Sequence, residues 1–310
     1  MTTAPTAPAP TTPAAGGPAS ARSRQHPAST WRRRSRRLLL LQLPLALICL
    51  LWLLPSIGLL ASSLRTQADA SATGWWHAFI PPLRFTELNY RTVLGDGGIG
   101  RAFLNSLLIT IPAVSLMTTL GTVLAYTLAR IPFRGARAVF ATVLVCSVLP
   151  VQVVLVPVLR LFDQTGAAGT WPGIWLVHAG LALPFVTYLL HGFFRQLPPE
   201  MFEAAELDGA DPLECLLRIA VPTSRAALAT VVIFQFLWVW NDLLIALVFL
   251  GGQADVAPLT VVLSGQVNQT TGQNWNLLTA AAAISMVCPL AVFFALQRHF
   301  VRGLVAGGVK

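Results

Sequence analysis

Charged residues are scarce in this 310-residue chain. Asp, Glu, Lys and Arg make up 11% of it, whereas 55% of its residues are hydrophobic and its mean hydropathy is +0.67. An ordinary soluble domain carries about 25% charged residues. The composition therefore excludes a typical soluble domain and predicts an integral membrane protein.

Lysine is almost absent. Lys310, the last residue of the sequence, is the only one, and the other twenty basic residues are arginines. The phosphate-binding loop of ATPases needs a lysine followed by Ser or Thr. We therefore expect no such loop and no ATP hydrolysis by this chain. No nucleophile is paired with a base either, so the sequence predicts no catalytic residues and no enzyme.

Cysteine is also rare. The four cysteines are Cys49, Cys146, Cys215 and Cys288. They have no C-x-x-C spacing, and three of the four lie in apolar runs. This pattern argues against a disulfide framework and against a zinc site. We expect free cysteines that pack as small hydrophobic side chains, with no metal and no cofactor bound by this chain.

What the chain has instead is long apolar segments. Six are long enough for a hydrocarbon core of about 30 Å. They run from about Leu38 to Leu60, Phe103 to Leu128, Ala138 to Leu159, Gly173 to Phe194, Ala226 to Leu250 and Leu277 to Leu296. Pro150 and Pro157 interrupt the third and predict a kinked helix within a bundle. A cleaved signal peptide is an alternative for the first, but the apolar core of such signals is only about 7–15 residues long.

The basic residues predict the orientation. Sixteen of the 21 fall in the N-terminal segment, residues 129–137, residues 195–225 and the C-terminal segment, and five fall in the intervening connections. Cytoplasmic loops carry the excess of Lys and Arg. The net charge of +9 thus indicates topology rather than nucleic-acid binding. We expect an all-α membrane protein with six transmembrane helices and both termini in the cytoplasm.

The predicted organisation has five parts. They are a disordered Pro/Ala/Thr-rich cytoplasmic tail (1–30), a basic flank with the first transmembrane helix (31–62), a periplasmic or extracellular segment (63–102), a core of five transmembrane helices (103–300) and a cytoplasmic C-terminal tail (301–310). Low complexity and the lack of apolar periodicity are the reasons for the disorder prediction.

Residues 195–225 form an unusual cytoplasmic loop, because they hold half of the twelve carboxylates of the chain. Pro198-Pro199 suits a helix start, Gly209 suits a left-handed corner, and Asp211 caps a second helix. A solvated acidic loop is one interpretation. The apolar residues Met201 and Phe202 favour the other, a helix–corner–helix element that docks a cytoplasmic protein.

This loop resembles a known signature. Glu203-Ala204-Ala205, then Gly209, then Ile219-Ala220-Val221-Pro222 is similar to the EAA motif of ABC-importer permease subunits, with Val221 in place of the usual leucine. Other segments resemble the carbohydrate, maltose-type branch of these permeases. They are Thr86 to Tyr90, Asn105-Ser106, Ala125-Tyr126, Ala129-Arg130, Leu149-Pro150, Trp240-Asn241-Asp242 and Gly303 to Lys310. The resemblance runs from about Leu38 to Lys310.

The resemblance implies a type I ABC-importer permease fold in the bacterial plasma (inner) membrane and a role in ATP-driven, binding-protein-dependent sugar import. The implied partners are a second homologous permease, two ABC ATPase subunits that bind the ATP and Mg, and an extracellular or periplasmic solute-binding protein. The loop would be a coupling helix seated in the ATPase, and the C-terminal tail would touch the ATPases. The residues implied in coupling are Glu203, Ala204, Ala205, Asp208, Gly209, Ile219 and Pro222.

Two further groups are candidates for contacts outside the coupling loop. Gln235, Trp238, Asn241 and Asp242 combine an aromatic ring with hydrogen-bonding groups, which suits a sugar path. Gln235, Trp238 and Asp242 have the spacing i, i+3, i+7, so we expect them to share one helical face. The alternative is that Trp238 and Trp240 belong to an interfacial belt and Asp242 makes a structural hydrogen bond.

The outer loop 251–276 supplies the other group. Its polar residues are Asn268, Gln269, Thr270, Thr271 and Gln273. A plain connector is one interpretation, and the resemblance implies contact with the binding protein.

Other classes of function are less consistent with the sequence. A secondary transporter is expected to show internal inverted repeats, and no clear repeat is present. An intramembrane enzyme needs convergent catalytic groups. Within the ABC class, a permease for amino acids, peptides or another solute is the nearest alternative to a sugar permease.

Overall fold

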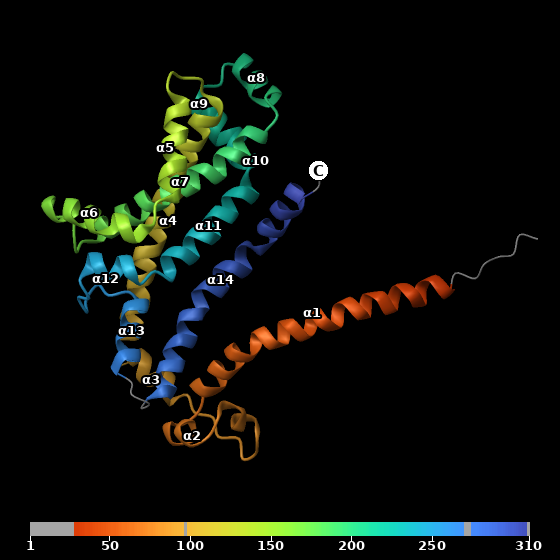
Figure 1. The fold of residues 1–310 in the computed structure, drawn as a ribbon, viewed down its shortest axis with the longest axis vertical. Helices are drawn as coiled ribbons and strands as arrows, with labels where there is room; N and C mark the ends of the chain where they lie inside the picture. Colours follow the sequence, from red (N-terminus) through yellow and green to blue (C-terminus); the bar gives the residue numbers. More distant parts are fainter. Residues whose placement is uncertain (1–27, 96–97, 270–273, 309–310) are drawn as a thin grey trace, which may run out of the picture. The chain divides into compact units, whose positions relative to one another are not determined.

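The computed structural model describes residues 28–95, 98–269 and 274–308, with side chains placed for 41–95, 98–267 and 274–298. Every regular element in these residues is helical (Figure 1). The chain divides into two compact units, residues 1–54 and 55–310. The first unit contains most of helix α1 (Ala28–Ser63).

Four helices are long and apolar enough to cross a membrane. They are the Leu41–Ser63 part of α1, α4 (Ile99–Arg130), α7 (Trp171–Gln196) and, in its Trp275–Arg298 part, α14 (Trp275–Gly308). These confirm that the first, second, fourth and sixth predicted segments are helices. Two bent pairs of helices bring the number of candidate spans to six if each pair counts as one.

Shorter helices complete the chain. Between α1 and α4 lie α2 (Gln67–Ala72), η1 (Trp75–Phe79) and α3 (Leu88–Gly95). Between α4 and α7 lie α5 (Ala136–Val148) and α6 (Val151–Gln164). After α7 come α8 (Glu200–Leu207), α9 (Pro212–Cys215), η2 (Leu216–Ala220), α10 (Val221–Thr223), α11 (Arg225–Trp240), α12 (Leu244–Leu250) and α13 (Leu259–Gln269).

The pair α4 and α7 forms the centre of the second unit, with α11 packed on α4 and α14 packed on α11 (Figure 1). Gly121 of α4 permits the close approach, because a Cβ atom at this position would lie 2.4 Å from Cγ1 of Val186 on α7. Small residues at helix contacts in membranes allow backbones to come near each other. Gly121 therefore sets the spacing of the central pair.

The third predicted segment bends more sharply than a kinked helix would. Helices α5 and α6 meet at 106° around Leu149 and Pro150. Pro150 has no N–H to donate, and it disfavours a helical conformation at the residue before it. Accordingly, Leu149 is extended, with φ −66° and ψ 125°.

The prediction of one continuous helix from Ala226 to Leu250 is wrong. Helix α11 ends at Trp240 and α12 begins at Leu244. The carboxylate of Asp242 accepts hydrogen bonds from the backbone N–H groups of Ile245 (3.2 Å) and Ala246 (2.9 Å). Asp competes for backbone donors in this way at helix starts, which is why it ends one helix and begins another. A second break precedes α11, because residues 212–223 meet it at 80°.

The segment 251–276, for which the sequence left open a plain connector or a contact with the binding protein, contains helix α13. Leu259 at its start is 2% exposed, and its N–H donates to Ser106 Oγ of α4 at 2.8 Å. The amide of Asn105 holds the preceding residues through the carbonyls of Asp255 and Ala257, both at 3.0 Å. The apolar run that follows Pro258 is the signal that sequence reasoning missed.

Two smaller differences concern the predicted tails. Helix α1 begins at Ala28, inside the range 1–30 predicted to be disordered, and residues 1–27 lie outside the described part. The backbone of residues 301–308 continues α14 rather than forming a separate tail.

We predict that Gly121→Ala destabilises the protein by about 1–3 kcal/mol, the usual range for overpacking. The added methyl group would collide with Val186. The measurement is the midpoint of thermal unfolding in detergent. Gly192→Ala is the matched control, because a Cβ atom there meets nothing within 4 Å. Equal midpoints for the two variants would contradict the prediction, and Val186→Ala should restore the midpoint in the Gly121→Ala background.

Candidate functional site

The predicted helix–corner–helix element is present. Helix α8 ends in a corner where Gly209 has φ +86°, a value that favours glycine. The backbone N–H of Ala210 donates to the Ala205 carbonyl at 2.9 Å, which closes the end of α8. Asp211 then caps α9, because its Oδ1 accepts from the N–H of Glu214 at 2.8 Å. The local signals for a helix start, a glycine corner and a helix cap therefore predicted this element correctly.

This elbow, residues 199–215, presents an exposed acidic surface. Its exposed residues include Glu200, Met201, Glu203, Ala204, Glu206, Leu207, Asp208, Asp211 and Leu213. Leu207 is the extreme case, with 89% of its surface exposed. Carboxylates around exposed apolar side chains are suited to a basic partner that also offers an apolar contact.

The remaining coupling candidates lie on the bundle side of the elbow. Ile219, in η2, is half-buried and packs against the core, and Pro222 is half-buried in α10. These two residues therefore join the elbow to the helices, whereas Glu203, Ala204 and Asp208 face outward.

The break after α11 separates the predicted sugar-path residues. Gln235 and Trp238 lie on α11, whereas Asn241 and Asp242 lie in the turn beyond it. Asn241 is exposed, and its side chain donates to the Leu237 carbonyl at 2.8 Å. Asp242 serves as the acceptor for the start of α12. The structure therefore does not place Gln235, Trp238 and Asp242 on one helical face, because α11 ends at Trp240.

Trp240 lies in the core rather than in an interfacial belt. It is 4% exposed, stacks on Phe236 with ring centroids 5.6 Å apart, and its Nε1 donates to the Ser285 carbonyl at 3.2 Å.

A histidine that the sequence did not single out as a site residue lies against the break. The His178 side chain is 1% exposed, and its Nε2 lies 3.5 Å from Oδ2 of Asp242. A carbonyl oxygen only accepts, so the 2.9 Å contact from His178 Nδ1 to the Ile174 carbonyl makes Nδ1 a donor. Nε2 has no hydrogen-bond partner among the described residues. The side chain also packs edge-on against Trp238, with centroids 5.6 Å apart.

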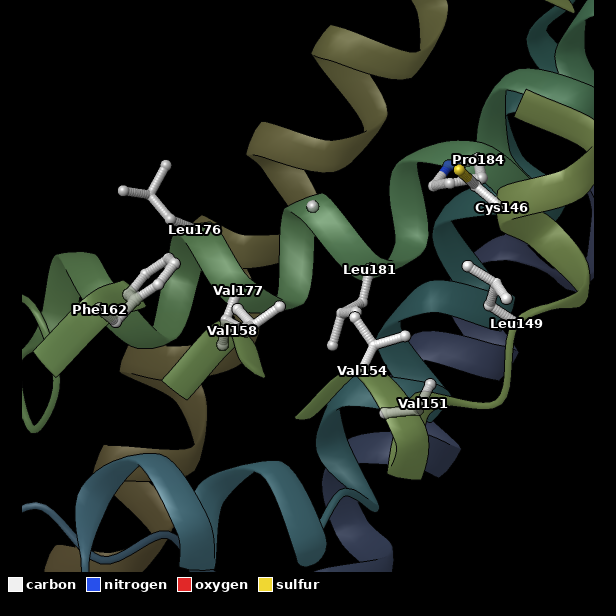
Figure 2. A pocket seen from close by; sticks show the side chains of 11 residues that line it. Cys146, Leu149, Val151, Val154, Val158, Phe162, Leu176, Val177, Leu181 and Pro184 are labelled. Carbon is white, nitrogen blue, oxygen red and sulfur yellow. The ribbon is translucent and has the colours of Figure 1, made fainter. Parts of the chain in front are cut away.

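Two neighbouring pockets lie where α5, α6 and α7 meet. The first, of about 300 Å³, has a largely apolar lining that includes Val154, Val158 and Leu176 (Figure 2). The second, of about 330 Å³, shares four residues with it and extends to α11. The shared residues are Cys146, Leu149, Val151 and Leu181.

Polar groups and aromatic rings distinguish the second pocket. Gln235 and Trp238 line it together with Ser147, Phe185 and Phe234. Gln235 is 5% exposed, and its amide makes no hydrogen bond to another described residue. Ser147 Oγ donates to the Val143 carbonyl and keeps its lone pairs free to accept. A buried amide without a partner is costly, so an amide that lines a pocket is suited to bind a polar ligand.

Sequence reasoning found Gln235 and Trp238 but missed the other members of this pocket. Ser147 is the polar residue two positions before Leu149-Pro150, a signal that could have placed it at a helix break. Phe185 and Phe234 lie in continuous apolar runs and carry no distinguishing pattern.

The predicted binding-protein contacts are Asn268, Gln269, Thr270, Thr271 and Gln273. Their side chains lie outside the described residues, so these predictions stay open. In the part of the chain with placed side chains, no group of three His, Cys, Asp or Glu residues is arranged to hold a metal ion.

Comparison with known proteins identifies relatives. Residues 117–305 match the family described as "Binding-protein-dependent transport system inner membrane component". The chain is 50% identical over 266 residues to the osmoprotective compounds uptake permease protein GgtD of Synechocystis sp., covering 85% of this chain and 89% of that one. It is 44% identical over 256 residues to the alpha-glucoside transport system permease protein AglG of Rhizobium meliloti, covering 81% and 67%.

The fold is similar to a chain in the crystal structure of a bacterial ABC transporter involved in the import of the acidic polysaccharide alginate. The TM-score is 0.70 at 21% sequence identity, and the match covers 86% of this chain and 98% of that one. At this identity the likeness concerns the fold.

We predict that Asp242→Ala lowers the stability by about 1–2 kcal/mol, the usual cost of removing an acceptor that caps a helix start. Asp242→Asn should cost less, because its amide oxygen still accepts. Thermal unfolding in detergent measures both variants. The control is Asn241→Ala, which removes an exposed side chain with a single local hydrogen bond. A loss for Asp242→Ala no larger than that of the control would contradict the capping role.

Proposed function

We propose that this chain, which belongs to the family of binding-protein-dependent transport system inner membrane components, is a permease subunit of an ATP-driven importer for carbohydrates. The elbow that follows α7 carries the proposal, because it provides an exposed acidic corner through which a separate ATPase can act on the helices. The relative named for alpha-glucoside transport, which is 44% identical over 256 residues, supports carbohydrate as the class of substrate.

The chain is a multi-pass membrane protein, as its family and its long apolar helices show. In the proposed topology each bent pair of helices counts as one span, which gives six spans with both termini in the cytoplasm. The distribution of basic residues supports this orientation. The elbow then lies on the cytoplasmic side, and α2, α3 and α13 lie on the outer side.

The proposed partners are a second permease, two ATPase subunits that bind ATP and Mg, and an external solute-binding protein. The exposed carboxylates of α8, Glu203 among them, would meet basic groups of the ATPase. Exposed Ala204 permits close approach, and Leu207 offers an apolar contact. Closure of the ATPase dimer would move the elbow and open the cavity outward, and hydrolysis would reset it.

The sugar path would include the pocket lined by Gln235 and Trp238. An aromatic face packs against the C–H face of a sugar, and an amide bonds its hydroxyl groups. The lining of this pocket includes no charged side chain, which favours a neutral saccharide over an acidic one. Asn241 and Asp242 would lie at the edge of the path and not in its lining. The carboxylate of Asp242 already accepts a hydrogen bond from the start of α12.

We predict that Glu203→Lys uncouples ATP hydrolysis from transport. Charge reversal on the exposed face of α8 should repel the basic groups of an ATPase. Substrate uptake by proteoliposomes should fall at least about ten-fold, the effect of about 1.4 kcal/mol, while the ATPase subunits retain unstimulated hydrolysis. Gly209→Pro should act likewise, because φ +86° is inaccessible to proline.

The matched control for charge reversal is Glu87→Lys, immediately before α3. Glu87 forms an exposed ion pair with Arg91 of α3, and such pairs contribute little stability. Helix α3 lies at the opposite end of the second unit from α8 (Figure 1). Unchanged uptake in both elbow variants would refute the coupling role.

We predict that Gln235→Met reduces sugar uptake about five- to ten-fold, the effect of losing one hydrogen bond of about 1–1.5 kcal/mol. The folded protein should not be destabilised, because an unpartnered amide is replaced by an apolar side chain of similar shape. The control is Gln196→Met, at an exposed position near the end of α7.

Uptake and thermal unfolding are measured on the same preparations. Normal uptake by Gln235→Met would remove this residue from the path.

The substrate itself can be identified with the wild-type complex. ATPase stimulation is measured with the binding protein loaded in turn with neutral saccharides, acidic saccharides and amino acids. Stimulation by amino acids alone would refute the carbohydrate assignment.

A further inference from the structure

Helix α8 has one buried side chain, Phe202, which is 6% exposed. Its ring lies under the guanidinium of Arg130, whose Cζ is 4.3 Å from the ring centroid. Ala205 and Ala210 are only partly buried against the core. Arg130 and the ring of Phe202 therefore form the main side-chain attachment of α8 to the bundle among the described residues.

The same guanidinium holds the end of α7. Nε and Nη2 of Arg130 donate to the Phe194 carbonyl at 3.1 and 2.7 Å, and Nη2 also donates to the Leu197 carbonyl. The last carbonyls of a helix have no partner within the helix, and this end of its dipole favours a cation. Arg130 comes from the end of α4, so it caps α7 from a neighbouring helix.

Tyr126, one turn earlier on α4, extends this contact. Its ring is 6.0 Å from Phe194 and 6.2 Å from Phe202, and the residue is 5% exposed. No carboxylate forms a salt bridge with Arg130 in the described part of the chain. Within the described residues, the guanidinium of Arg130 contacts the carbonyls of Phe194 and Leu197 and the π face of Phe202.

We propose that Arg130 is the positioning residue that transmits the movement of α8 to α4 and α7. This inference rests on the proposed coupling role of α8. The covalent path from α8 leads back to α7 through residues 197–199 and forward to α9, and neither path includes α4. The guanidinium joins all three helices at one group, so displacement of Phe202 displaces the central α4–α7 pair.

Lysine cannot replace this arginine. A planar guanidinium can donate to two carbonyls while its face lies on an aromatic ring, whereas an ammonium is a compact point charge. The variant Arg130→Lys keeps the positive charge but loses the planar arrangement of donors. It therefore distinguishes a positioning role of Arg130 from a role that needs only its charge.

The test uses the full complex, purified with its partner subunits through a tag on this chain and reconstituted in proteoliposomes. The ratio of substrate transported to ATP hydrolysed is measured for the wild type, Arg130→Lys, Arg130→Gln and Phe202→Leu. We expect this ratio to fall at least five-fold in all three variants, with unstimulated ATP hydrolysis retained. Arg134→Gln, at an exposed position in the following loop, should match the wild type.

A double variant gives a second readout. Arg130→Gln combined with Phe202→Leu should be no worse than either single variant, because both act through the same contact. A wild-type ratio in Arg130→Lys would overturn the proposal. So would a parallel loss of transport and ATP hydrolysis with a lowered unfolding midpoint, which indicates a purely structural role. Failure of the proposed function appears separately, as a wild-type complex that transports no sugar.

Discussion

Backbone groups inside a lipid bilayer have no water to bond, so every interruption of a spanning helix must find its partners within the protein. The break after α11 meets this requirement locally. Asp242 accepts from the first N–H groups of α12, and its own carbonyl accepts from Thr260 Oγ1 at 2.6 Å. The end of α7 meets it through Arg130. In both places a polar side chain supplies hydrogen bonds that the helix itself cannot make.

This constraint explains which parts of the fold were predictable. Long uninterrupted helices follow from apolar length alone, so α4, α7 and α14 could be predicted closely. The elbow could be predicted because its signals are local: a glycine at a positive φ and an aspartate before a proline. The break at Asp242 could not, because Asp within an apolar run is equally compatible with a continuous helix. The contacts that Asp242 makes at the break come from residues distant in sequence, Thr260 of α13 and His178 of α7. These contacts leave no local signal in the sequence.

The candidate path shows the same division. Gln235 and Trp238 were found because they are polar or amphipathic residues one turn apart on one helix. Ser147, Phe185 and Phe234 enter the pocket only through the 106° bend at Pro150 and the packing of α7 on α11. A pocket assembled from three separated segments leaves no periodic signal in the sequence, so its composition is a property of tertiary structure.

The two ends of the second unit are fixed by different kinds of interaction. At the end that contains α3, amide networks join distant segments: Asn89 donates to the carbonyls of Ser63 and Arg65 and accepts from Asn276. At the end that contains α8, aromatic rings and one guanidinium join α4, α7 and α8. A cation over a ring is attracted over a broad range of positions, whereas the hydrogen bonds of Arg130 to the Phe194 and Leu197 carbonyls need fixed distances and angles. The end proposed to receive force therefore combines a ring contact with α8 and directional bonds to α7. Because the guanidinium is planar and rigid, a displacement of the ring of Phe202 reaches the α7 carbonyls through a single group.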